Sequence, residues 1–445
     1  MAVVFHFDLL RTSNNVHPTT GSRSAASPVK PEGKPVNLGK FLLLCVVLAL
    51  VAAACTPGRL GGSSTGWSPA AVSDGVVYIG TKQGEIKALE DGGFESLKVK
   101  WTYCVRGPSQ AGDKCDTGLG GAYGAPAFGP QLVYVAGVDG NLYAIEKETG
   151  EIGDAGWRLA VKARGEEDPE PLVAEPTLDI ERNLVLVGSE DGNLYAFDAR
   201  PKSVIPRNSD GTPRDRMAWD QPFHTDGKIW STPVVGAGTV YFGSHDNNVY
   251  AVDIDSGEEK WRFATGGVVA GRPLLFDGLV VAGSFDRNLY GIDANNGNLV
   301  WKVEGSNWFW AGAVANERTI FAPSMDGNIY AVDVSGNLLW KHDMGDPIVS
   351  RPVLVPRGLV VAAKNGKVSL LNINTLVVAS AREISSVRVR DAEVKAPLFA
   401  VEDAVFVGAQ DSTVTRLNMS TQREVWCFDT DIPVIAVEFG EIRCD

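Results

Sequence analysis

The sequence predicts an all-β protein, an eight-bladed β-propeller of four-stranded antiparallel blades. Three observations lead to this prediction. A hairpin-like unit recurs eight times, its copies lie 39 to 56 residues apart, and in several copies a tryptophan follows four residues after a turn glycine. Repeats of this length with several short strands each are typical of propellers.

The repeated unit is clearest in residues 133–145 and 185–197. In both, two apolar runs rich in Val, Leu and Tyr flank the tripeptide Asp-Gly-Asn. These turn residues tolerate positive φ, so the pattern predicts two antiparallel strands joined by a tight turn. The turn positions of the eight copies are Gly84, Gly140, Gly192, Asn247, Arg287, Gly327, Gly366 and Ser412.

A second turn and a tryptophan complete each unit. Trp261, Trp301 and Trp340 stand four residues after a turn glycine. We expect a new strand to begin at each tryptophan and to lead to a small-residue–Pro step such as Thr232-Pro233. The corresponding tryptophans of other units are Trp101, Trp157, Trp219 and Trp426.

The units must stack around an axis, because one unit cannot bury both of its faces. The first unit lacks a recognisable leading strand, whereas Trp426–Asp429 provides a spare strand near the end of the chain. We therefore predict that this C-terminal strand joins the first blade and closes the ring. The alternatives are a parallel solenoid and a ring of seven blades.

The N-terminal segment predicts export. An apolar stretch, Phe41–Ala54, follows Lys30, Lys34 and Lys40 and ends in three alanines before Cys55. It is shorter than the roughly 20 residues of a membrane span and has the three regions of a secretory signal. The small residues before Cys55 resemble a bacterial lipobox, although Ala52 stands where leucine is usual. Ordinary cleavage after an alanine, or an uncleaved anchor, is the alternative to lipidation of Cys55.

These features divide the chain into three parts. Residues 1–55 form a leader and lipoprotein-type signal peptide, 56–66 a linker, and 67–445 a single propeller domain. The predicted location is the bacterial cell envelope, with the exported chain held at a membrane by its lipid.

Four cysteines remain outside the signal segment, in two pairs that are close in sequence. Cys104 and Cys115 form one pair, and Cys427 and Cys444 the other. An exported chain with this pattern is expected to form the disulfides Cys104–Cys115 and Cys427–Cys444. Free buried thiols are the alternative.

The net charge of the chain limits the classes of partner that it can bind. With 41 basic and 54 acidic residues, the formal net charge is −13. Such a surface repels phosphate backbones, so we expect no nucleic-acid partner. The expected partners are envelope proteins or a small ligand, and the expected state is a monomer.

The recurring string Asp-Gly-Asn-Leu-Tyr-Ala, followed by Gly and Trp, resembles the pyrroloquinoline-quinone-like (PQQ-like) propeller repeat. The resemblance extends from Trp67 to about Asp429. It implies the propeller fold but leaves the function open, because this repeat occurs in quinoprotein dehydrogenases and in the lipoprotein propeller of the outer-membrane β-barrel assembly machinery.

No catalytic constellation stands out in the sequence. Quinoprotein dehydrogenases, as the resemblance implies, carry a vicinal disulfide over the quinone, and this chain has no adjacent Cys-Cys pair. His224, His245 and His342 are dispersed over different units, which disfavours a metal cluster or a nucleophile–base pair. We expect no metal and no cofactor, with a quinone as the less favoured alternative.

One stretch departs from the repeat. Trp308, Phe309 and Trp310 precede a step that lacks the usual proline. Trp230 occupies the same place in an earlier unit, and Arg272 and Arg351 stand directly before their prolines. Because the innermost strands of a propeller line its axis, these six residues are candidates for a ligand or partner site at the mouth of the axial channel. Packing between blades is the alternative for the three consecutive aromatics.

The sequence therefore predicts a non-catalytic binding or scaffold module tethered outside the cytoplasm. The competing hypothesis is a quinoprotein-like dehydrogenase or cofactor carrier with a degenerate quinone site.

Overall fold

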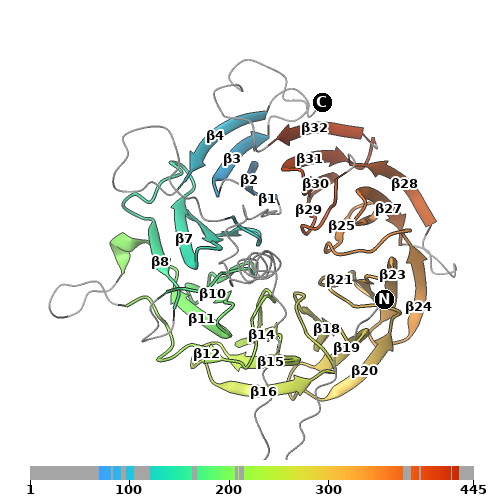
Figure 1. The fold of residues 1–445 in the computed structure, drawn as a ribbon, viewed down its shortest axis with the longest axis horizontal. Coiled ribbons are helices and arrows are strands. Elements are labelled where there is room, and N and C mark those ends of the chain that lie inside the picture. The colour runs from blue at the N-terminus through green and yellow to red at the C-terminus, as the bar shows by residue number, and fades with distance from the viewer. Residues whose placement is uncertain are drawn as a thin grey trace, which may run out of the picture. The chain divides into compact units, whose positions relative to one another are not determined.

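The computed structural model describes residues 70–81, 84–91, 97–104, 121–162, 168–205, 209, 215–373, 382–389, 392–421 and 423–429. Over these residues it confirms the predicted fold class: eight four-stranded antiparallel sheets stand as blades around one axis (Figure 1). A 3₁₀ turn, Lys202–Val204, is the one helical element in this part of the chain.

Each blade uses four consecutive strands. The innermost strands are β1 (Ala71–Ser73), β5 (Ala127–Phe128), β9 (Thr177–Asp179), β13 (Val234–Gly236), β17 (Leu274–Phe276), β21 (Val314–Ala315), β25 (Val353–Val355) and β29 (Phe399–Val401). The second strands are β2 (Val76–Gly80), β6 (Leu132–Ala136), β10 (Leu184–Gly188), β14 (Thr239–Gly243), β18 (Leu279–Gly283), β22 (Thr319–Pro323), β26 (Gly358–Ala362) and β30 (Ala404–Gly408).

The third strands are β3 (Ile86–Asp91), β7 (Asn141–Glu146), β11 (Asn193–Asp198), β15 (Asn248–Asp253), β19 (Asn288–Asp293), β23 (Asn328–Asp333), β27 (Lys367–Asn372) and β31 (Thr413–Asn418). The outermost strands are β4 (Leu97–Tyr103), β8 (Trp157–Ala160), β12 (Phe223–His224), β16 (Glu259–Ala264), β20 (Leu299–Glu304), β24 (Leu338–Asp343), β28 (Arg382–Arg388) and β32 (Arg423–Asp429). Blades are numbered 1 to 8 in this order, so blade 1 contains β1–β4 and blade 8 contains β29–β32.

The turn between the second and third strands forms at the predicted residues. All eight turn positions, from Gly84 to Ser412, have φ between 72° and 88°. In five blades the turn aspartate accepts a hydrogen bond of 2.5–2.6 Å from the hydroxyl of the tyrosine four residues later, as Asp286 does from Tyr290. Burial and this bond raise the pKa of Tyr290 to about 12. The repeated Asp and Tyr are thus explained by turn structure.

Tryptophans connect successive blades. Trp261 of β16 donates its indole N–H to the carbonyl of Ala294, 3.0 Å away in the next blade, and packs on Gly297 there. Trp101, Trp219 and Trp301 make the same contact with the blade that follows each of them. The glycine is required for two reasons, since its φ is +74° and a Cβ would lie 2.8 Å from the indole ring.

The prediction for ring closure is wrong. The last strand, β32, pairs with β31 of its own blade, and blade 1 has its own leading strand in β1. Blades 1 and 8 instead meet through a cluster of buried side chains, Ala70, Val77, Ile79, Leu89, Phe406, Val414 and Phe428. The Lys87 ammonium also lies 6.0 Å from the centre of the Phe428 ring. Both end blades are complete, and in the described part of the chain buried side chains join them.

We predict that replacing Gly297 with alanine destabilises the propeller more than replacing Gly278. Both glycines have φ near +75°, but Gly278 has open space where a Cβ would lie. Gly278→Ala should therefore cost about 1 kcal/mol of unfolding free energy from backbone strain, and Gly297→Ala about 1–3 kcal/mol more because it displaces Trp261. Denaturant unfolding of both variants measures the difference, and equal midpoints would contradict the proposed docking contact.

Candidate functional site

One end of the ring is built by the same backbone contact in seven blades. In each of these blades the second residue after the second strand donates its N–H to a carbonyl in the segment that leads into the same blade, over 2.8–3.1 Å. The donor–acceptor pairs are Val138–Gly121, Glu190–Pro171, His245–Lys228, Phe285–Val268, Met325–Trp308, Lys364–Pro347 and Gln410–Glu393. We call the end of the ring that carries these residues the mouth face.

Side chains alternate along the segment that follows each acceptor. The next residue is buried, as in Ile229, Val269 and Ile348, which are fully buried. Phe309 occupies this position, is 0% exposed and packs edge-on against Tyr330 at 5.2 Å. The prediction that Phe309 contacts a ligand is therefore corrected, because its ring belongs to the core.

The flanking tryptophans meet other aromatic rings on the mouth face. Trp308 is 41% exposed and stacks on Phe285 with ring centres 4.5 Å apart and an angle of 2°. Phe285 also stacks on Trp310 at 5.2 Å, and Trp310 lies 6.3 Å from Trp230. With His245, whose ring is 4.4 Å from that of Trp230, these residues form what we call the aromatic cluster. It joins blades 4, 5 and 6.

Glu190 fixes one side of the cluster. Its carboxylate accepts a 2.9 Å hydrogen bond from the Trp230 indole and a 2.6 Å bond from the Lys228 ammonium. Burial and the charge of Lys228 lower the pKa of His245, and the charge of Glu190 partly opposes them. This shift favours the neutral form of the His245 ring.

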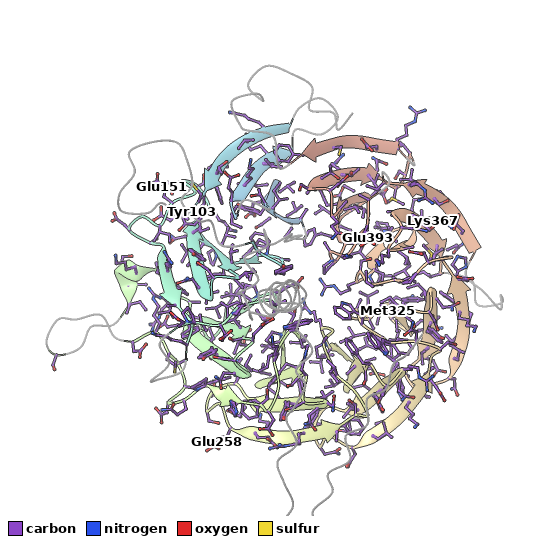
Figure 2. The ribbon with its side chains drawn as sticks, viewed as in Figure 1. Tyr103, Glu151, Glu258, Met325, Lys367 and Glu393 are labelled. Carbon is purple, nitrogen blue, oxygen red and sulfur yellow. The ribbon has the colours of Figure 1, made fainter. Side chains whose placement is uncertain are left out.

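Glu393 organises the other side of the mouth face. It pairs with Lys395 at 2.6 Å and with Lys364 at 3.2 Å, and Lys395 also bonds to Gln410 at 3.3 Å. Figure 2 shows Met325 and Glu393 close to the axis, whereas Glu151 and Glu258 lie at the outer edge of the ring.

Arg272 and Arg351 lie beside Gly312, at the start of the innermost strands. A Cβ on Gly312 would be 2.7 Å from the Arg272 carbonyl oxygen and 3.5 Å from Arg351 Cδ. Glu175 pairs with Arg272 at 3.7 Å. Burial, together with the nearby charge of Arg351, lowers the pKa of Arg272. The structure thus brings five of the six candidate residues to the mouth face.

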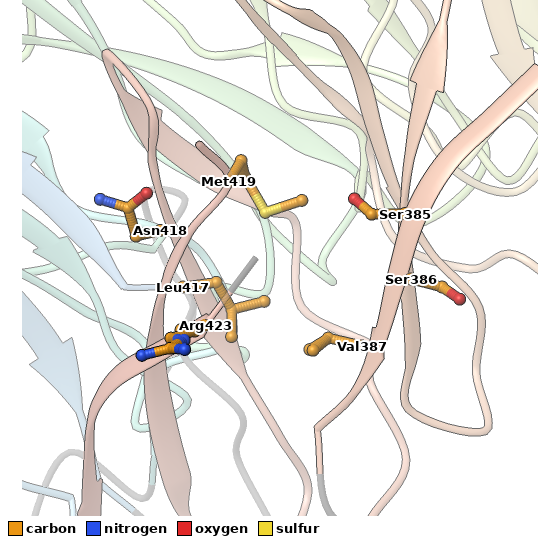
Figure 3. Close-up of a pocket in the computed structure, with 7 residues that line it drawn as sticks. All are labelled: Ser385, Ser386, Val387, Leu417, Asn418, Met419 and Arg423. Carbon is orange, nitrogen blue, oxygen red and sulfur yellow. The ribbon is translucent and has the colours of Figure 1, made fainter. Parts of the chain in front are cut away.

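Two cavities lie elsewhere on the described chain. The cavity between β28 and the β31–β32 turn has a volume of about 10 Å³, which is room for one water (Figure 3). A larger cleft of about 450 Å³ lies where blades 1 and 8 meet, at the opposite end of the ring, with Asp74, Asp403 and Phe406 in its lining.

No metal-ligand group is apparent among the described residues: none of their His, Cys, Asp and Glu side chains gather in threes. His224 lies in β12, His245 after β14 and His342 in β24, three separate blades. No helix in the described ranges is long and apolar enough to cross a membrane. Cys55, Cys115 and Cys444 lie outside the described residues, so lipidation and both disulfide pairings stay predictions.

The comparison with known families follows from the repeat. Residues 16–200 and 207–428 match the family described as outer membrane protein assembly factor BamB. The chain belongs to this family. The predicted resemblance to a PQQ-like propeller of the assembly machinery is thereby confirmed.

Individual BamB relatives are distant. The factor BamB of Burkholderia pseudomallei strain K96243 is 31% identical over 147 residues, 33% of this chain. The chain spans about a third (31%) of the length of that curated relative. BamB from Moraxella catarrhalis superposes with a TM-score of 0.57 at 18% identity, over 78% of this chain and 92% of that one. The computationally designed protein Ika8 superposes with a TM-score of 0.59 at 17% sequence identity, over 80% of this chain and 97% of that one. These two structures bear on the fold alone.

Sequence reasoning missed Phe285, Glu190 and His245. Each stands directly before the turn residue Asp286, Asp191 or Asp246, a position that varies widely between copies of the repeat. Aligning that position across this BamB-family chain would have found all three.

We predict opposite shifts in the pKa of His245 when its two charged neighbours are neutralised. Lys228→Gln should raise this pKa, because it removes a nearby positive charge, whereas Glu190→Gln should lower it. NMR titration of the His245 ring protons measures both shifts. Lys260→Gln, at the opposite end of a blade, is the control, and shifts of the same sign in the first two variants would contradict the arrangement.

Proposed function

We propose that this chain is a non-catalytic scaffold of the bacterial cell envelope that takes part in the assembly of outer-membrane proteins. Family membership supports this role, because the matched family is described as an outer membrane protein assembly factor. The proposal assigns no cofactor to the chain, in line with its lack of an adjacent cysteine pair.

The mouth face is the surface that we propose binds a protein partner or small ligand. The observation that carries this part is the aromatic cluster, in which Trp308 leaves 41% of its surface exposed while stacked on Phe285. Large exposed aromatic rings are enriched where proteins bind partners, because they bury much apolar area at a small entropic cost. Stacking and the Glu190 bonds hold these rings in place before binding.

The location follows from the N-terminal residues. We propose that residues 1–55 direct export and end at a lipidated Cys55, that 56–66 link the lipid to the propeller in 67–445, and that the protein is a monomer at the membrane. Cys104–Cys115 and Cys427–Cys444 would form the disulfides of an oxidising compartment.

Removing the chain from the source bacterium should lower the amount of folded outer-membrane barrels, and restoring it should reverse the loss. Trp308→Ala should restore less than wild type, because it deletes the exposed ring of the cluster. Ile180→Ala, which trims a residue 61% exposed at the opposite end of a blade, should restore fully. Heat-modifiable gel mobility measures folded barrels, and unchanged barrel levels after deletion would refute the assembly role.

Cys55→Ser should release the protein from membranes. Without the thiol no acyl chain can attach, so the variant should appear in the soluble envelope fraction, whereas Cys45→Ser, inside the apolar stretch, should stay membrane-bound. Cell fractionation and intact mass of the mature N-terminus give the readout. Equal distribution of the two variants would exclude a lipid anchor at Cys55.

A further inference from the structure

Several cationic side chains lie on the mouth face, in a chain whose net charge is −13. The charged side chains of this face include five cations and three carboxylates whose pairing bears on an anion site. The cations are Lys228, Arg272, Arg351, Lys364 and Lys395, and the carboxylates are Glu175, Glu190 and Glu393.

Each of the three lysines and Arg272 has an ion pair, whereas Arg351 has none among the described residues. Lys228 pairs with Glu190, and Lys364 and Lys395 share Glu393. Arg272 has Glu175 at 3.7 Å, a long contact, and Arg351 has no ion pair with any residue that the structure describes. Arg351 therefore adds a positive charge without an ion pair beside Arg272, whose own ion pair is long.

Gly312 lies between these arginines. Arg272, Gly312 and Arg351 occupy the same position in three successive blades, two residues after the cluster position of Trp310. A side chain at Gly312 would collide with the Arg272 backbone. With glycine there, the two guanidinium groups can both approach one anion, and guanidinium groups bind carboxylate and phosphate in a bidentate manner.

The arginines adjoin the aromatic cluster. A Cβ on Gly271 would lie 2.6 Å from the Trp310 carbonyl oxygen, so residues 271 and 310 are in direct backbone contact. Ser231 also donates a 2.9 Å hydrogen bond to the Gly271 carbonyl. The segments that carry Trp230, Arg272 and Trp310 are therefore neighbours around the axis.

We propose that Arg272 and Arg351 bind the anionic group of a ligand whose apolar part packs on the aromatic cluster. This inference rests on the proposed function, since it names the chemistry that the mouth face recognises. The cluster continues over three blades from Trp230 to Trp308, which suits an extended peptide with an acidic residue between aromatic ones. A small amphiphilic phosphate or phosphonate has the same two chemical parts and is the other source of such an anion.

The test uses three probes on the purified propeller. The peptides Ac-Phe-Glu-Phe-NH2 and Ac-Phe-Gln-Phe-NH2 differ only in the anionic group, and benzylphosphonate represents the non-peptide source. Binding is followed by NMR shifts of the tryptophan indole N–H groups, which report locally on Trp230, Trp308 and Trp310. Arg351→Gln is the main variant, Arg351→Lys keeps the charge, and Arg318→Gln removes an exposed arginine at the opposite end of a blade.

The glutamate peptide should bind more tightly than the glutamine peptide, and added salt should weaken it. Arg351→Gln should lose about tenfold in affinity, Arg351→Lys should lose less, and Arg318→Gln should match wild type. If benzylphosphonate binds more tightly than the glutamate peptide and also loses affinity in Arg351→Gln, the anion site is supported and its natural ligand is a phosphate or phosphonate rather than a peptide.

Equal affinity for the two peptides, or wild-type affinity in Arg351→Gln, would overturn the proposal, as would the absence of binding to all probes. These outcomes leave the proposed function to be judged separately, because barrel assembly is measured in cells. A propeller that restores assembly yet ignores the anions retains the scaffold role and loses only the arginine site.

Discussion

Docking of a tryptophan on the next blade is the contact on which the rest of the structure depends. The indole of Trp261 fills the space over Gly297, and its buried N–H donates a hydrogen bond to the carbonyl of Ala294. The same contact recurs for Trp101, Trp219 and Trp301, so it sets the distance and angle between neighbouring blades. Trp157 makes a different contact, because the Arg216 guanidinium lies over its indole ring, 4.3 Å from the ring centre.

Blade spacing in turn creates the mouth face. Once the blades are set, the entering segments of blades 2 to 8 accept a hydrogen bond from the equivalent backbone N–H, and their residues alternate between core and surface. Phe309 therefore enters the core, while Trp308 and Trp310 turn outward to Phe285. The same backbone hydrogen bond, repeated around the ring, therefore places one of three consecutive aromatic rings in the core and the other two at the surface.

The fold was predictable because its signals are local, whereas the site depends on contacts between blades. Turn positions such as Asn247 and Arg287 could be read from spacing, and all have positive φ. The leading strand β1 escaped notice because three residues show no periodicity, which led to the wrong ring closure. Phe285 and Glu190 were missed because their partners, Trp308 and Trp230, come from other segments of the chain.

The seam between blades 1 and 8 has a topological consequence. Among the described residues no strand is shared across it, so every blade is a continuous piece of chain, and Val77 and Ile79 pack against Phe406 and Phe428. The described strands pair only within their own blade, so blades can fold in the order of synthesis while the seam forms last. The seam therefore joins two blades that are each complete, which makes the fold compatible with circular permutation at this point.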